Sequence, residues 1–297
     1  MKRSLKEDLK EYARNVKDSA LVDDSHFYDF RQNIYGGTMK KEIEDMFLKG
    51  DGNELVSKAC AVHSSSMLGY NFFHWVAKEA PLRLYFGSES GKEVIEYTDV
   101  LYEVKIPVLK GSRAANMDIV LKNDSGDILF IESKFLEYTS TGKFTISDSY
   151  KKAVRFFTKG EEWAEFISSL DTSMEKQYWD GIKQEICHSI GLWNWIAGMD
   201  IKNLPSFSNA RDIRFINLVF KPNPKYEKEY AAFKAYQKRY EELHQKLKEL
   251  SLIPNGIKMS FLTYTDIWSD ITDCITPDLK KYLDEHYMVF ANPNSDH

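Results

Sequence analysis

Two carboxylates and one ammonium group fall within a single short stretch of this chain, residues 116–137. Asp118 stands in one apolar run, and Glu132 and Lys134 close a second. Carboxylates held close together repel, and burying an uncompensated charge is costly, so such a cluster needs a counter-ion. Mg²⁺ is a hard cation that takes oxygen ligands, commonly one or two carboxylates together with water and phosphate. These residue types therefore predict a hydrolytic metal site.

The two apolar runs have the composition of a β-hairpin. Both are rich in β-branched and large apolar residues, and the Asn-Asp-Ser-Gly link between them is typical of a tight turn. If the turn pairs Asn123 with Gly126, antiparallel pairing follows through the rest of the hairpin. Asp118 then lies opposite Ile131, and a one-residue change in turn length sets it opposite Glu132. In either register the side-chain origins of the carboxylates are about 4.5–8 Å apart.

Side chains alternate along a strand, which separates the charged groups from the apolar ones. In the second strand Glu132 and Lys134 project from one face. In the first strand Met117 and Ile119 turn one way and Asp118 turns the other. Three charged groups are therefore expected to converge at the end of an otherwise apolar sheet.

An acid-x-Lys pattern alone is weak evidence for such a site. The chain has four further matches, which begin at Asp8, Glu103, Asp200 and Asp278. Only the match at Glu132 combines an apolar strand, a turn and an upstream aspartate. The alternative is that the three charged groups form a solvated sheet edge with one salt bridge.

In this order the residues resemble the PD-(D/E)XK nuclease superfamily, which has the restriction-endonuclease-like fold. The resemblance implies that Asp118 and Glu132 are the metal-binding carboxylates and that Lys134 is the catalytic lysine. Met117 stands where the family pattern has its proline. The implied cofactor is Mg²⁺ or Mn²⁺, and the implied partner is DNA.

Many members of the superfamily place a further glutamate upstream of the aspartate. Glu103 is the better candidate for this fourth site, as a catalytic residue and metal ligand, and Glu54 is its rival. Glu137 extends the strand match on the face of Glu132 and Lys134.

Two more segments, 63–73 and 182–192, resemble a subgroup of short restriction-endonuclease-like proteins. In the second, Gln184 and His188 are four residues apart on a predicted helix and share one face. The resemblance suggests that both line the site and touch the scissile phosphate or a metal-bound water. The alternative is that they are polar residues on a packed helix with an apolar face of isoleucines.

The function implied is hydrolysis of DNA phosphodiester bonds by a metal-dependent endonuclease, with duplex DNA as the default substrate. Such a metal polarises the phosphodiester and lowers the pKa of a bound water, while Lys134 orients the nucleophile or offsets negative charge. The main rival is a catalytically silent nucleic-acid-binding or assembly protein that keeps the fold. A third reading is an acidic patch that binds a protein partner. Defence and repair are both open as biological roles, and a homodimer is one candidate assembly.

Composition sets the bounds around this site. With 297 residues and 43% hydrophobic content, the chain can bury a substantial core. No apolar run is long enough to cross a membrane, and the N-terminus lacks the apolar centre of a signal peptide, so a cytoplasmic location is expected. Cys60, Cys187 and Cys274 lack metal-ligand spacing, which indicates neither a disulfide framework nor a zinc site.

The net charge of −5 is unusual for a nucleic-acid enzyme, because phosphate binding normally recruits a basic surface. The net charge of the whole chain does not show where basic surface patches lie. In addition, a bound cation would reverse the local electrostatic field at the acidic site. The candidate phosphate contacts are Lys105, Lys110, Arg113, Lys143, Lys151, Lys152 and Arg155. The alternative is that most of them are ordinary solvated surface.

The fold expected is α/β, with a restriction-endonuclease-like core: a mixed sheet of about five strands flanked by helices, and a helical N-terminal extension. Residues 1–80 would form a helical region packed on a core at 81–297, as one structural domain overall. Predicted helices are 3–18, 38–49, 54–78, 150–169, 175–198 and 225–250. Predicted strands are 93–108 (one strand or a hairpin), 116–122, 127–137, 211–220 and 258–265.

The long helix at 225–250 carries aromatic residues at three- and four-residue steps, including Tyr236 and Tyr240. Aromatic side chains among lysines can stack on nucleic-acid bases. Such a stripe is more often the buried face of a surface helix, and that is the interpretation we favour.

Overall fold

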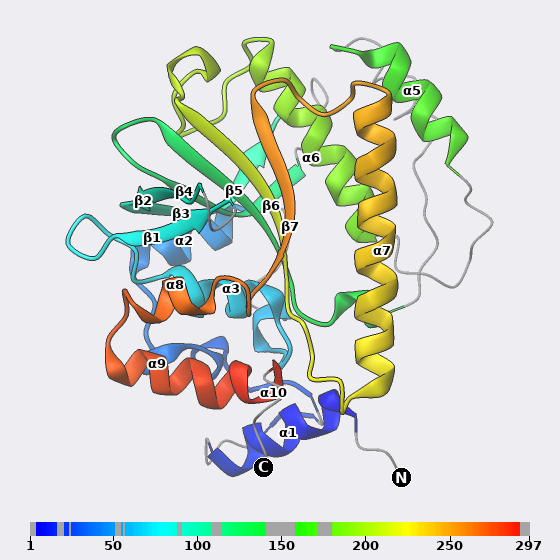
Figure 1. Ribbon diagram of the computed structural model, residues 1–297. Coiled ribbons are helices and arrows are strands. Elements are labelled where there is room, and N and C mark those ends of the chain that lie inside the picture. Colours follow the sequence, from blue (N-terminus) through cyan, green and yellow to red (C-terminus); the bar gives the residue numbers. More distant parts are fainter. Residues whose placement is uncertain are drawn as a thin grey trace.

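The computed structural model describes residues 4–16, 21–23, 25–50, 55, 57–87, 91–108, 115–140, 158–170 and 180–291. At its centre is a five-stranded sheet in the order β3-β4-β5-β6-β7 (Figure 1). The strands are β3 (Asp99–Ile106), β4 (Ala115–Lys122), β5 (Asp127–Lys134), β6 (Asp212–Val219) and β7 (Ile257–Thr263). The first three are antiparallel and the last two run parallel to β5, so the predicted mixed sheet is confirmed.

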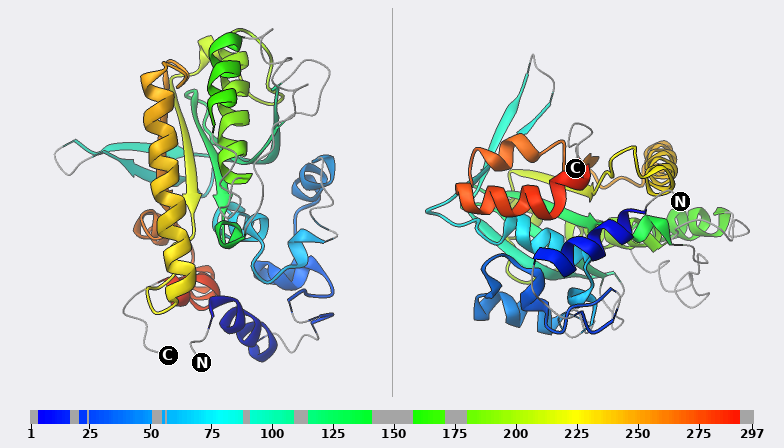
Figure 2. Two further views of the ribbon diagram at one scale, coloured as in Figure 1. Left: turned by 90° about the vertical axis from the view of Figure 1, so that its right-hand side faces the viewer. Right: turned by 90° about the horizontal axis from the view of Figure 1, so that it is seen from below.

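Helices flank both faces of this sheet, as predicted. They are α1 (Leu5–Val16), α2 (Lys41–Lys49), α3 (Ser65–Phe73), α5 (Gly160–Ser169), α6 (Asp180–Ile196), α7 (Glu227–Glu249), α8 (Trp268–Thr272), α9 (Pro277–Leu283) and α10 (Val289–Ala291). Helices α6 and α7 lie side by side on one face, and α3 lies against the other (Figures 1 and 2). Among the described helices, none has both the length and the apolar composition needed to cross a bilayer.

Glycine allows close packing of a helix on each face. At Gly69 of α3, an added Cβ would lie 2.6 Å from Cδ1 of Ile119. At Gly191 of α6, it would lie 2.2 Å from Cγ2 of Ile106. Separations this short are far inside van der Waals contact, so only glycine lets α3 and α6 approach β4 and β3 this closely.

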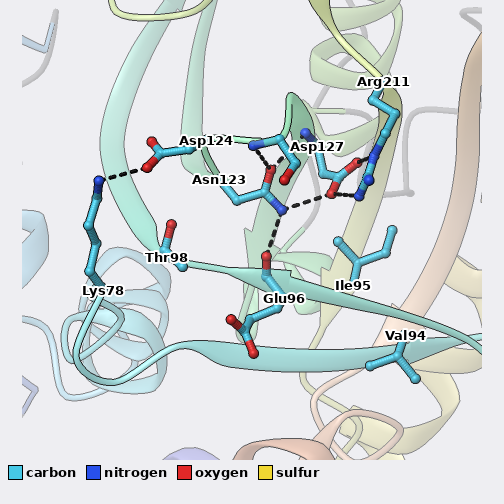
Figure 3. A pocket seen from close by; sticks show the side chains of 10 residues that line it. Lys78, Val94, Ile95, Glu96, Thr98, Asn123, Asp124, Asp127 and Arg211 are labelled. Atoms are coloured by element: carbon cyan, nitrogen blue, oxygen red, sulfur yellow. Dashed lines mark hydrogen bonds and ion pairs between the residues drawn. The ribbon is translucent and has the colours of Figure 1, made fainter.

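The hairpin of β4 and β5 adopts the second of the two predicted registers. Ile119 pairs with Ile131, and continuing by one step sets Asp118 opposite Glu132. The turn is held by the side chain of Asn123, whose Oδ1 accepts hydrogen bonds from the backbone N–H groups of Ser125 and Asp127, both at 3.0 Å (Figure 3). This side chain replaces a backbone hydrogen bond, so it selects the longer turn.

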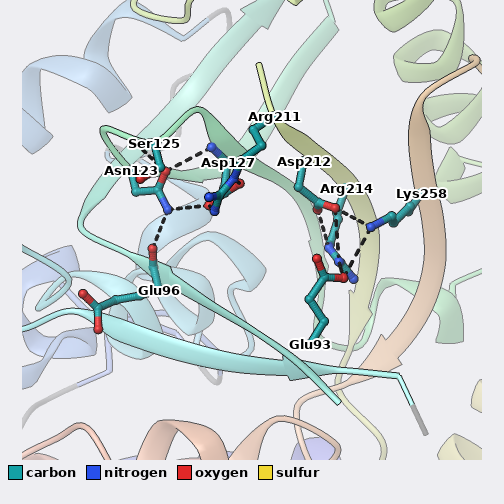
Figure 4. A network of polar contacts seen from close by, with 9 residues as sticks. All are labelled: Glu93, Glu96, Asn123, Ser125, Asp127, Arg211, Asp212, Arg214 and Lys258. Carbon is teal, nitrogen blue, oxygen red and sulfur yellow. Dashed lines mark hydrogen bonds and ion pairs between the residues drawn. The ribbon is translucent and has the colours of Figure 1, made fainter. Parts of the chain in front are cut away.

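The strand prediction at 93–108 needs correction, because its first part belongs to a separate two-stranded sheet. Strand β2 (Glu93–Tyr97) pairs with β1 (Leu82–Phe86), which the sequence patterns did not indicate. This small sheet projects from the body of the molecule (Figure 2). It is tied to the main sheet by ion pairs from Glu93 to Arg214 and Lys258, and by the Asn123 Nδ2 hydrogen bond to the Glu96 carbonyl at 2.7 Å (Figure 4).

The predicted helix at 54–78 is also wrong in extent, because α3 begins only at Ser65. Ser64 Oγ accepts a hydrogen bond from the N–H of Met67 at 3.3 Å and so caps the helix. Upstream, Ala61 forms an antiparallel bridge with His26, which holds the chain extended there. The serine at the N-cap and the long-range bridge together set the start of the helix at Ser65.

The aromatic stripe of α7 faces inward, as favoured from the sequence. Phe233, Tyr236 and Tyr240 are buried, and the Tyr236 and Tyr240 hydroxyls donate hydrogen bonds to groups on β6, α6 and β7. Base stacking on this stripe is therefore excluded.

Candidate active site

The three charged groups of the hairpin come together at the end of β4 and β5. Lys134 Nζ donates a hydrogen bond to Glu132 Oε1. The backbone N–H of Ser133 donates to Asp118 Oδ2 at 2.8 Å. Glu132 is 0% exposed and Lys134 is 4% exposed. The alternative of a solvated sheet edge is therefore wrong for Glu132 and Lys134, which are buried, whereas Asp118 is half-buried.

The predicted alternation along β4 fails at Asp118. Met117 packs in the same apolar cluster as Val120, whereas Ile119 belongs to the cluster on the opposite face. Met117 and Ile119 therefore do not share a face, contrary to the prediction. A strand reverses its alternation in this way only where its backbone departs from the regular extended conformation.

The cause lies opposite, in β3. Glu103 has a φ of +50°, a left-handed conformation that is uncommon for a residue with a Cβ. The ladder pairs Tyr102 with Ile119 and Val104 with Met117, which leaves Glu103 and Asp118 facing each other between those pairs. The twist brings both carboxylates to the same cavity. Strain of this kind clusters at functional sites.

Helix α6 brings His188, one of the predicted site residues, onto the hairpin of β4 and β5. His188 Nε2 lies 3.0 Å from the carbonyl oxygen of Asn116, which can only accept, so Nε2 carries the proton. His188 Nδ1 lies 3.5 Å from Glu132 Oε2. Burial lowers the pKa of His188 to about 4, so the ring is neutral and Nδ1 is an acceptor. Two acceptors thus face each other, and neither has a hydrogen-bond partner.

Burial also shifts the carboxylates. The pKa of Asp118 is raised to about 7, first by burial and then by the charge of Glu132. The pKa of Glu132 is raised by burial, against the opposing effect of Lys134. A single ammonium group does not offset two buried carboxylates, so the pair favours an added proton or cation.

A cavity of about 790 Å³ opens above these groups. Five of the six predicted site residues line it: Glu103, Asp118, Lys134, Gln184 and His188. Glu132 lies behind them, fully buried. The structure therefore brings all six predicted residues to one place, although their roles stay predictions. Glu54, the rival to Glu103, lies outside the described residues.

Comparison with known families finds one whose description is Restriction Endonuclease associating with ARP, and its model matches residues 23–288. The chain belongs to this family. The match covers the β4–β5 hairpin, α6 and the whole five-stranded sheet, and it confirms the resemblance to the PD-(D/E)XK nucleases and the restriction-endonuclease-like fold. Membership indicates a nuclease-like function. Comparisons with curated proteins and with solved structures found no match.

The restriction-endonuclease hairpin has buried polar neighbours that sequence reasoning missed. Glu185 of α6 accepts a hydrogen bond from the Tyr240 hydroxyl at 3.3 Å, and burial raises its pKa to about 8. Asn217 of β6 pairs with Glu132 in the parallel ladder. One signal was present for Glu185, which stands one helical turn before His188. Nothing local indicates Asn217, because parallel pairing joins strands far apart in sequence.

The residues of the restriction-endonuclease site fit a hard divalent cation. Glu132 Oε2 is buried without a hydrogen-bond partner, and the pKa of Asp118 is raised first by burial and then by the charge of Glu132. Within the described part of the chain, no group of three His, Cys, Asp or Glu side chains is placed to hold a metal. A cation here would depend on two carboxylates, with water and phosphate as the remaining ligands, which is the habit of Mg²⁺.

A second hollow of about 410 Å³ lies at the opposite end of the hairpin, around its turn (Figure 3). Its carboxylates already have cations: Asp124 pairs with Lys78 and Asp127 pairs with Arg211. Because these carboxylates are already neutralised by cations, this hollow does not favour a metal ion as the cavity above β4 and β5 does.

The candidate phosphate contacts named from the sequence are mostly not placed. Lys105 is exposed on β3 and does not line the cavity. Lys110, Arg113, Lys143, Lys151, Lys152 and Arg155 lie outside the described residues.

Proposed function

We propose that this protein is a metal-dependent endonuclease that hydrolyses DNA phosphodiester bonds in the cavity above β4 and β5. The observation that carries the proposal is the pair of carboxylates, the fully buried Glu132 and the half-buried Asp118, next to the ammonium group of Lys134. A structural ion pair would bury one charge of each sign. This site buries an excess carboxylate and leaves Glu132 Oε2 without a partner, which supports a cation-binding role.

Asp118 and Glu132 would hold Mg²⁺ or Mn²⁺, with Glu103 as a further ligand or as the residue that orients a metal-bound water. When bound, the cation supplies Lewis-acid activation of the phosphodiester and a water of lowered pKa. Asp118 is kept in place by the N–H of Ser133. Because this donor comes from the backbone of β5, the geometry of the carboxylate is set by the sheet itself.

Lys134 contributes the positive charge on the reacting side. Its side chain lines the cavity while its stem is buried, so the ammonium group can orient the attacking water or offset negative charge that develops on the phosphate. Burial among apolar neighbours strengthens this interaction, because the local dielectric constant is low.

Helix α6 supplies the second row of groups. His188 is neutral and its Nε2–H group donates to the Asn116 carbonyl, so it ties α6 to β4 beside Glu132 rather than carrying charge. Gln184 lies one turn earlier and lines the same cavity. Its amide can donate to a phosphate oxygen or to a water molecule.

A plasmid cleavage assay tests this proposal. Wild-type protein is expected to cut with Mg²⁺ or Mn²⁺ and to lose activity in EDTA, in Asp118→Asn and in Lys134→Ala. Asp124→Asn is the matched control, since Asp124 belongs to the turn at the other end of the same hairpin. Cleavage that survives EDTA or either active-site substitution would remove the site assignment. DNA binding without cleavage under every condition would favour a silent relative of the nucleases.

A further inference from the structure

The lining of the cavity differs in charge between the part that comes from the sheet, which we call the floor, and the sides around it. The carboxylates that line the cavity, Glu103, Asp118 and Glu137, all come from the sheet strands or from the turn after β5. Another side of the lining is built from α1, from chain segments before α3 and from the first turn of α3, and it contributes Lys6, His26, Lys58, His63, Ser64, Ser65 and Ser66. Among the described lining residues of that side there is no carboxylate.

This side has a positive character at His63. The pKa of His63 is lowered to about 4, first by burial and then by the nearby charges of Lys6, His26 and Lys10. Its Nδ1 atom is buried and has no hydrogen-bond partner. A neutral imidazole among cations, with an unsatisfied nitrogen, gains both a proton and a partner when an anion arrives.

The segment that carries His63 is attached to the catalytic strand. Ser133 Oγ donates to the carbonyl of Ser65 at 3.2 Å, and the N–H of the same serine donates to Asp118. Ser133 therefore joins the acidic floor to the basic side through one residue.

One histidine of this side is already paired. His26 Nδ1 lies 3.0 Å from the carboxylate of Asp23, so this ring already has an anionic neighbour. Lys6 and Lys58 reach the cavity from two different elements, α1 and a 3₁₀ turn at Lys58–Cys60. Lys6, Lys58 and His63 all line the cavity, and we call these three residues the basic wall.

We propose that the basic wall binds the backbone phosphate next to the scissile one, on the DNA strand that lies in the cavity. This inference rests on the proposed function, because it takes the floor as the place of hydrolysis. The cavity volume, about 790 Å³, falls within the range of roughly 300–1,000 Å³ typical of ligand sites. A local basic wall also explains how a chain of net charge −5 can hold a polyanion.

The wall is tested by DNA binding in the Asp118→Asn background, so that binding is measured without turnover. A labelled duplex is titrated over a range of NaCl concentrations with Lys6→Ala/Lys58→Ala and with Lys202→Ala, an exposed lysine remote from the cavity. The wall variant is expected to bind about tenfold more weakly and to lose about one from the slope of log K against log salt. Lys202→Ala should match the parent.

Steady-state kinetics and the pKa of His63 provide two independent tests of the basic wall. In the otherwise wild-type enzyme, Lys6→Ala/Lys58→Ala should raise KM while kcat stays within about twofold, because the wall does not touch the reacting atoms. NMR titration of the histidine ring carbons should show that the pKa of His63 rises when the duplex is added, because a phosphate stabilises the imidazolium form. His63→Gln identifies the resonance.

The outcomes separate the two proposals. If the enzyme cleaves DNA but the wall variant keeps the affinity and salt slope of its parent, or the pKa of His63 does not move, the basic wall is wrong and the nuclease assignment stands. If the wild-type protein neither binds nor cleaves duplex DNA, the proposed function fails and the wall fails with it.

Discussion

The contact between His188 and Glu132 sets two hydrogen-bond acceptors against each other inside the protein. His188 Nδ1 and Glu132 Oε2 lie 3.5 Å apart, and neither has a donor. Unsatisfied buried acceptors cost free energy, typically about 1–3 kcal/mol each. Nearby, the pKa of Asp118 is raised to about 7. The residues of the site are therefore arranged for a cation or proton, at the expense of the stability of the metal-free protein.

Asp118→Asn should stabilise the metal-free protein at alkaline pH. A carboxyl group whose pKa is raised on folding from 3.8 to about 7 favours the folded state below pH 4, and that stabilisation is lost as the pH rises to 7. Asparagine removes the charge and keeps an oxygen acceptor for Ser133. Thermal unfolding in EDTA should show a higher Tm than wild type at pH 8, and the gain should be small at pH 4. Asp124→Asn should show no gain, and an unchanged Tm for Asp118→Asn would contradict the buried-charge account.

Saturating Mg²⁺ should raise the Tm of the wild-type protein at pH 8 and should have little effect on Asp118→Asn/Glu132→Gln. A ligand present at a hundred times its Kd stabilises the folded state by about 2.7 kcal/mol. The effect should diminish in acid, where protonation of the two carboxyl groups competes with the cation. Differential scanning fluorimetry with and without Mg²⁺ measures the shift. Equal shifts in both proteins would place the cation elsewhere.

At the scale of elements, the site depends on how closely helices approach the sheet. Helix α6 reaches β3 across Gly191, and α3 reaches β4 and β5 across Gly69. In β3 the left-handed Glu103 interrupts the regular alternation, and Glu103 lines the same cavity as Asp118. The hairpin of β4 and β5 therefore forms one side of the candidate site, and β3, α3 and α6 close the other sides.

Gly191→Ala should lower the free energy of unfolding by about 1–3 kcal/mol, the usual cost of overpacking a core. The added Cβ would lie 2.2 Å from Cγ2 of Ile106. Ile106→Ala removes that atom, so chemical denaturation of the double variant should show a cost well below the sum of the single costs. Gly91→Ala is the control, because a Cβ there meets no atom within 4 Å. Strict additivity would show that the two residues do not meet.

At the scale of the whole molecule, ion pairs join the projecting β1–β2 sheet to the five-stranded sheet (Figure 4). Arg214 of β6 bonds to Glu93 of β2 and to Asp212 of its own strand, and it lies 3.9 Å from the ring centre of Phe86. Its side chain is nearly buried, whereas the Arg83–Glu96 pair within the small sheet is exposed. The two pairs should therefore differ in their effect on stability.

Arg214→Ala should destabilise the protein by about 1–3 kcal/mol, because it leaves the nearly buried Asp212 with only Lys258 as a cation and removes the packing of the guanidinium on Phe86. Arg83→Ala should change stability by less than about 1 kcal/mol, as exposed ion pairs do. Urea denaturation of both variants provides the comparison. Similar costs for the two would indicate that Arg214 is not buried in solution.

The sequence by itself determined the catalytic hairpin and the long helix. Asp118, Glu132 and Lys134 lie within one turn and two short strands, so alternation and turn chemistry were enough to predict that they converge. The aromatic face of α7 followed from helical periodicity for the same reason. Residues close in sequence can be arranged relative to one another in only a few ways. The local pattern of residue types is therefore enough to predict which of them come into contact.

Only the tertiary structure decided the rest of the site. Asn217 reaches Glu132 through parallel pairing of β5 and β6, and the basic wall reaches the floor through the contact of Ser133 with Ser65. Glu103 is held in a left-handed conformation opposite Asp118. Each of these depends on segments far apart in the chain, or on strain that the surrounding packing must over-determine. A local residue pattern identifies neither the distant residue that completes the site nor the packing that holds a strained residue in place.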